Sequence, residues 1–191
     1  MENKTINSEV SKSALPAGLL KALVYIAGCA QVIALLPYFN TDSIDFFESI
    51  SPIGEIVSTL IEALFLCLVA YKVNKEDMPI PAKYILAFAA IGLLTMFQPL
   101  FSDGFEIIMS IIVLIVAAVV VFNFIKFKPT QKIGLFQIAT IACSFLLTIY
   151  SDELLSVSDI GILKILIFAS VAPFVLYLGS CYDFLCEKSE E

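Results

Sequence analysis

The chain of 191 residues is 60% hydrophobic and only 15% charged, whereas a soluble domain is about 45–50% apolar, so the composition is typical of a membrane protein. It contains no His and all 11 cationic residues are Lys, which excludes a His-ligated metal or haem, a Ser-His-Asp or Cys-His nucleophile, and a bidentate Arg clamp for phosphate. The net charge of −7 also argues against nucleic acid as a partner.

Six apolar stretches follow one another along the chain, each of about 18 to 25 residues, the length that a helix needs to cross a hydrocarbon core roughly 30 Å thick. They cover residues 15–39, 52–73, 82–101, 105–127, 133–150 and 160–184. We therefore expect an all-α, polytopic integral membrane protein with a single six-helix transmembrane bundle over residues 15–184. Residues 1–14 are predicted to form a polar cytoplasmic tail, and residues 185–191 an acidic one.

The lysines indicate how this bundle is oriented. Ten of the 11 lie at the amino terminus, in the second and fourth connections, or at the carboxyl terminus, which a six-span topology places on one side of the membrane. Cytoplasmic segments are enriched in Lys, so we predict that both termini are cytoplasmic and that the protein resides in the bacterial inner membrane. The exception is Lys164, about one turn into the sixth span from the outer side.

A faint repeat accompanies the three expected hairpins. The odd spans are preceded by a proline, at Pro16, Pro81 and Pro129. They are followed by an aspartate, at Asp42, Asp103 and Asp152. Three parallel copies of one helical hairpin would produce this pattern. The ordinary placement of aromatic residues at membrane interfaces and of polar residues in loops would produce the same pattern.

The first span carries small residues at four-residue steps, at Gly18, Ala22, Ala30 and Ala34. Small residues allow two helices in a membrane to approach closely. This face is expected to pack either within the fold or against a partner membrane protein.

The second span carries an acidic residue, Glu62, near the membrane midplane, where an ionised group costs at least about 2.5–3.5 kcal/mol. Four polar residues at spacings of three and four lie on one face of this helix, which we call the polar face: Glu55, Ser58, Thr59 and Glu62. The next residues on that face, Leu66 and Val69, are apolar. The polar face therefore ends halfway across, which predicts a cavity open to the outside with Glu62 at its base.

Other side chains give this group a second interpretation. A neutral Glu62 hydrogen-bonded to Gln31 of the first span would act as structural glue between helices. Lys164 either pairs with Glu55 or Glu106, or extends to the outer interface.

Two classes of function compete. In the favoured class, the protein is a solute- or cation-binding or permeation subunit of a transporter, in which acidic outer loops attract cations and Glu62 binds one. In the alternative, it is a non-transporting membrane partner, an assembly or immunity-type subunit, in which Glu62 only ties helices together. An enzyme is not expected, because the chain offers carboxylates, hydroxyls and isolated lysines without a nucleophile and base pair. No metal or other cofactor is expected; the partners are the lipid bilayer and a small solute or cation.

Overall fold

The computed structural model describes residues 15–36, 44–97, 103–155 and 160–187, and the side chains of 44–48, 103–107, 147–155 and 160–168 lie outside the described part. The two predicted tails, 1–14 and most of 185–191, also fall outside it. The helices are α1 (Ala17–Ala34), α2 (Ile44–Lys75), α3 (Ala82–Thr95), α4 (Asp103–Lys126), α5 (Gln131–Leu155) and α6 (Ile160–Cys186), with the short 3-10 helix η3 (Lys128–Thr130) before α5. The described residues form no strand, so the all-α prediction is confirmed for them.

Four helices in the described part are long and apolar enough to cross a membrane. They are α1, Ser49–Lys75 of α2, Ile108–Lys126 of α4 and Ala169–Cys186 of α6. Helix α3 is shorter than predicted, with 14 residues, and ends at Thr95, whose hydroxyl donates a 2.7 Å hydrogen bond to the Gly92 carbonyl. These lengths and compositions indicate a membrane protein with at least four helices of spanning length.

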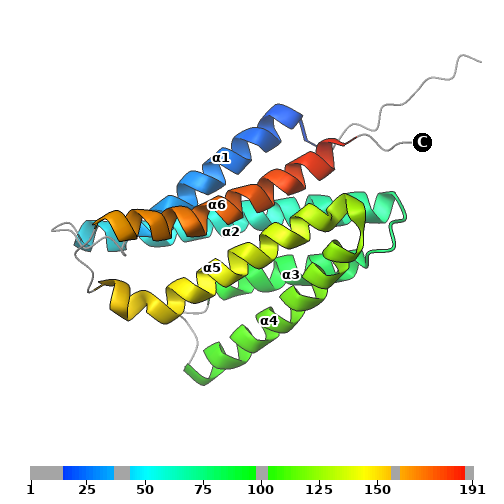
Figure 1. Ribbon diagram of the computed structural model, residues 1–191. Coiled ribbons are helices and arrows are strands. Elements are labelled where there is room, and N and C mark those ends of the chain that lie inside the picture. Colours follow the sequence, from blue (N-terminus) through cyan, green and yellow to red (C-terminus); the bar gives the residue numbers. More distant parts are fainter. Residues whose placement is uncertain (1–14, 37–43, 98–102, 156–159, 188–191) are drawn as a thin grey trace, which may run out of the picture.

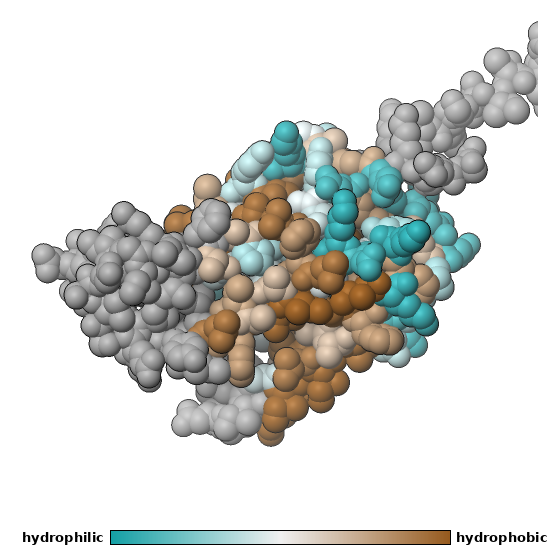
Figure 2. Space-filling view, in the orientation of Figure 1, coloured by the Kyte–Doolittle hydropathy of each residue, from teal (hydrophilic) through white to brown (hydrophobic). Residues whose placement is uncertain are grey.

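The helices pack side by side in chain order (Figure 1). Helices α2 to α6 each contact the next, α6 returns to contact α2, and α1 lies against both α2 and α6. The start of α1, the α2–α3 and α4–α5 connections and the end of α6 therefore lie at one end of the bundle. We call this the lysine-rich end, because it gathers Lys72, Lys75, Lys83, Lys126, Lys128 and Lys132. Figure 2 shows hydrophilic side chains concentrated there.

Helix α2 is longer than its predicted counterpart. It begins at Ile44 and runs through Pro52, at which the sequence predicts its start. The Ser51 hydroxyl donates a 2.8 Å hydrogen bond to the Ala34 carbonyl, which ties the end of α1 to this early part of α2.

Close contact between α1 and its neighbours depends on two glycines. A Cβ atom at Gly54 would lie 2.5 Å from the Ala30 carbonyl oxygen, and one at Gly28 would lie 2.8 Å from Val175 of α6. Ala30 is buried, whereas Gly18 and Ala22 are exposed. The later half of the small-residue face is thus used inside the fold, and the earlier half is open.

Apolar residues also cover the outside of the molecule. On α4, exposed side chains appear on several sides of the helix, including Ile108, Leu114, Ile115 and Phe122, the last 70% exposed. A helix that is apolar all round lies in a membrane or a large core. Figure 2 shows hydrophobic side chains at the surface over this part of the molecule, as expected for contact with lipid.

Candidate functional site

The candidate site is built on the middle of α2. Glu62 is half-buried, and its neighbours along the helix, Ile61, Phe65 and Leu66, belong to the core. These apolar residues fix the rotation of α2, because they pack against α1, α3 and α6. The Glu62 carboxyl is thereby directed into the bundle rather than to its apolar outer surface.

Two fully buried side chains of α6 face this carboxyl. Tyr177 and Cys181 lie one helical turn apart, and both interact electrostatically with Glu62. The Tyr177 hydroxyl lies beside the carboxyl, although within the described residues it makes no hydrogen bond of standard length and angle. The two groups are neighbours that a small side-chain movement would join. No lysine of the described part pairs with Glu62.

The remaining residues of the polar face are not equivalent. Glu55 is exposed and Thr59 half-buried. Ser58 is only 3% exposed, and its hydroxyl donates a 3.0 Å hydrogen bond to the Glu55 carbonyl of its own helix. Below Glu62, Leu66 and Val69 lie fully in the core. Of the polar face, Glu62 is the residue whose carboxyl lies beside Tyr177 of α6.

Gln31 does not meet Glu62. The contacts of Gly54 with Ala30 and of Ser51 with Ala34 set the register of the antiparallel helices α1 and α2. This register places Gln31 near the level of Gly54, about 12 Å along the axis from Glu62 at 1.5 Å per residue. The structure shows no hydrogen bond between these two described residues, and the Tyr177 hydroxyl lies beside Glu62 instead. The side chains of Lys164 and Glu106 lie outside the described residues.

Sequence reasoning missed a second buried polar group, Gln137 of α5. Its side chain is 2% exposed, and neither its amide nitrogen nor its amide oxygen has a hydrogen-bond partner in the described part of the chain. The signal in the sequence was an amide side chain within an apolar stretch, since Gln can hydrogen-bond between membrane helices as Ser and Thr do. Tyr177 was missed as well, because tyrosine is common in membrane helices near their ends.

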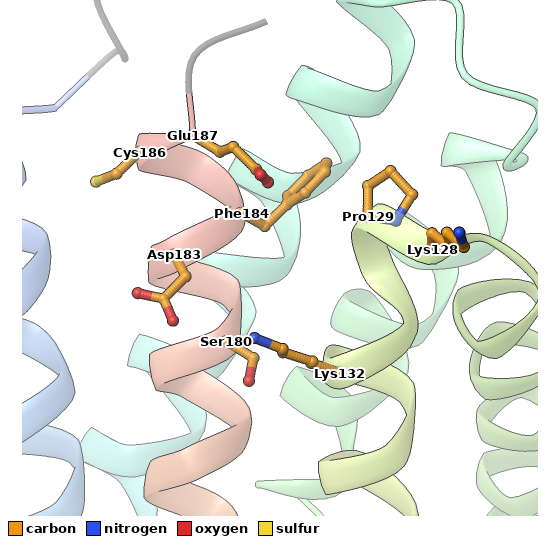
Figure 3. A pocket seen from close by; sticks show the side chains of 8 residues that line it. All are labelled: Lys128, Pro129, Lys132, Ser180, Asp183, Phe184, Cys186 and Glu187. Atoms are coloured by element: carbon orange, nitrogen blue, oxygen red, sulfur yellow. The ribbon is translucent and has the colours of Figure 1, made fainter. Parts of the chain in front are cut away.

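The lysine-rich end holds a cavity of about 440 Å³ between α5 and α6 (Figure 3). Its lining includes Lys128, Lys132, Ser180, Asp183, Phe184 and Glu187. Figure 3 shows Lys132 reaching from α5 towards Ser180 of α6. Ser180 is 8% exposed and stands one turn from Tyr177, so the cavity approaches the Glu62 site from this end.

Lys72 of α2 caps the carboxyl end of α6. Its ammonium group donates hydrogen bonds of 2.6 Å to the Phe184 carbonyl and 2.7 Å to the Glu187 carbonyl, and lies 4.8 Å from the centre of the Phe184 ring. Glu76, one turn further along α2, lies 3.7 Å away. Lys72 thus satisfies carbonyls that the end of a helix leaves without an intrahelical partner.

The described residues contain no group of three or more His, Cys, Asp or Glu side chains placed to hold a metal ion. No protein-family model, curated protein or solved structure matches the chain. Its function is therefore argued from the geometry at Glu62.

Proposed function

We propose that the protein is a cation- or solute-binding subunit of a membrane transport system and that Glu62 binds a proton or a small cation within the bilayer. The observation that carries the proposal is the pairing of Glu62 with the buried Tyr177 hydroxyl, with no lysine beside it among the described residues. An acidic side chain in a membrane interior is costly and is usually retained for proton or ion transfer.

The proposal includes a six-span topology. Helices α3 and α5 would complete the bundle, α5 with 25 residues and α3 with the residues that follow Thr95. The lysine-rich end would face the cytoplasm together with both termini, in a bacterial inner membrane. The three-hairpin repeat stays a prediction, supported by the prolines at or just before the starts of α1, α3 and α5.

The ligand set favours a small, singly charged species. Calcium takes six to eight oxygen ligands, and the described neighbours of the Glu62 carboxyl offer one phenol oxygen and one thiol. A carboxyl group beside a hydroxyl suffices to bind and release a proton.

The alternative is a structural role in a non-transporting membrane partner. It is favoured by the position of the two groups, because the Glu62 carboxyl on α2 lies beside the Tyr177 hydroxyl on α6, across two helices in contact. A hydrogen bond formed between the two groups would contribute about 0.6–2 kcal/mol, as between membrane helices in general.

Reconstitution in liposomes separates the two functions. The experiment measures proton and cation flux and thermal stability for wild type, Glu62→Gln and the control Glu55→Gln, which alters an exposed carboxyl on the same helix. Transport predicts that Glu62→Gln abolishes flux at nearly unchanged stability and that Glu55→Gln retains it. Absence of flux in the wild type, with a clear loss of stability in Glu62→Gln, would support the structural role.

A further inference from the structure

Between Glu62 and the lysine-rich end, buried polar side chains lie on α5 and α6 rather than on α2. Along α2, the residues below Glu62 are apolar and closed: Leu66 is 2% exposed and Val69 0%. Along α6, in contrast, polar side chains recur towards the same end, at Tyr177, Ser180 and Asp183. Ser180 and Asp183 line the cavity, whereas Tyr177 lies beside Glu62.

Gln137 stands on the helix opposite this row. Helix α5 runs antiparallel to α6 and contacts it, and Lys132 of α5 lines the cavity with Ser180 and Asp183. Gln137 lies about 7.5 Å further along α5, which brings it near the level of Tyr177. Both side chains are buried, and both have polar atoms without a standard hydrogen-bond partner in the described residues.

Two unsatisfied polar groups at one depth call for a physical reason, since buried polar atoms are nearly always hydrogen-bonded to protein, water or an ion. An amide can donate to one neighbour and accept from another, and a hydroxyl can do the same. Both can therefore join a chain of hydrogen bonds with water molecules that enter from the cavity.

We infer that the species bound at Glu62 is a proton and that it passes between Glu62 and the cavity at the lysine-rich end through Tyr177 and through water molecules held by Gln137. This inference rests on the proposed function of Glu62. A proton leaves the Glu62 carboxyl and enters the hydrogen-bonded chain, and another leaves the chain to water in the cavity beside Asp183, so that charge and atoms balance. A hydrated sodium or potassium ion does not follow this route, because Tyr177 and Gln137 are packed in the core.

The test uses the full chain in liposomes with a pH-sensitive dye inside and an imposed pH gradient. The variants Tyr177→Phe and Gln137→Leu remove the polar atoms and keep the approximate shape, and Thr140→Val is the control. Thr140 lies on the same helix as Gln137, but its hydroxyl already donates a 2.9 Å hydrogen bond to the Phe136 carbonyl. A carbodiimide that modifies protonated carboxyl groups in membranes reports in parallel on Glu62.

We expect proton flux to fall at least tenfold in Tyr177→Phe and Gln137→Leu and to stay within twofold of wild type in Thr140→Val. Modification of Glu62 by the carbodiimide should persist in all three variants. Sodium and potassium flux should be absent throughout.

Other outcomes would contradict the route, the identity of the bound species or the proposed function. Wild-type proton flux that survives in either Tyr177→Phe or Gln137→Leu overturns the route and leaves the proposed function of Glu62 intact. Sodium or potassium flux that depends on Glu62 overturns the assignment of the proton. Absence of any flux in the wild type, or wild-type flux that survives in Glu62→Gln, overturns the proposed function and the inference with it.

Discussion

At the scale of single residues, burial and hydrogen bonding distinguish side chains that the sequence presents as equivalent. Thr140 and Gln137 are both polar residues of α5. The Thr140 hydroxyl reaches a carbonyl of its own helix, whereas the Gln137 amide has no partner among the described residues. Of these two residues, Gln137 is the one whose polar atoms have no protein partner among the described residues, and a buried group left unsatisfied costs about 1–3 kcal/mol in general.

This difference predicts that Gln137 lowers the free energy of unfolding and is retained for its function. Replacing Gln137 by Leu removes the unsatisfied amide and fills a similar volume, so the free energy of unfolding should rise by about 1 kcal/mol. Thermal unfolding in detergent, with Thr140→Val as the reference, measures the change. A loss of stability in Gln137→Leu would show that the amide is satisfied within the folded protein.

The sequence identifies Glu62 because a carboxyl stands out within an apolar stretch of α2. It does not identify Tyr177, because tyrosine carries no charge and its depth depends on how α6 packs. The sequence does not reveal the offset between Gln31 and Glu62 either. The depth of Glu62 counted from a helix start at Pro52 says nothing of the register of α1 and α2, which the contact at Gly54 sets. Contacts between distant segments are not encoded in local periodicity.

At the scale of the elements, α1 and α2 are held at a separation that only glycine permits at position 54. A methyl group there would lie 2.5 Å from the Ala30 carbonyl oxygen and 2.7 Å from the Ala34 nitrogen. Both are backbone atoms, which cannot turn aside as a side chain can. The two helices would have to move apart.

We predict that Gly54→Ala lowers the free energy of unfolding by about 1–3 kcal/mol, as overpacking generally does. Gly18→Ala is the matched control, since nothing lies within 4 Å of a Cβ atom at Gly18. Alanine favours a helix over glycine by up to about 1 kcal/mol, so this control should be neutral or more stable. Equal melting temperatures for the two variants would contradict the close contact.

The limits of the helices were predicted with unequal success. Helix α4 was expected over 105–127 and spans Asp103–Lys126, because its apolar stretch is continuous. Helix α2 extends eight residues before its expected start, and Pro52 lies inside it, where it lacks the N–H for one intrahelical hydrogen bond. Helix α3 stops at Thr95 although the apolar sequence continues, which composition alone does not reveal.

At the scale of the whole molecule, the lysine-rich end and the apolar outer surface together define how the bundle would sit in a membrane. We predict that single cysteines at Asn74 and Gln131, in a chain without its native cysteines, are protected from an impermeant maleimide added outside intact cells. Cysteines at Ser43 and Asp103, at the other side of the predicted topology, should react. Labelling of the cysteine at position 74 with protection of the one at position 103 would show that the protein has the opposite orientation.

The bond that Lys72 makes to the end of α6 also has a consequence for biosynthesis. The carbonyls at the end of α6 are met by a side chain of α2, which is synthesised much earlier than α6. Helix α6 can therefore have these carbonyls satisfied as soon as it docks against α2. A reporter protein fused after the last residue should leave insertion and yield unchanged, whereas the same fusion on a Lys72→Met chain should lower the yield.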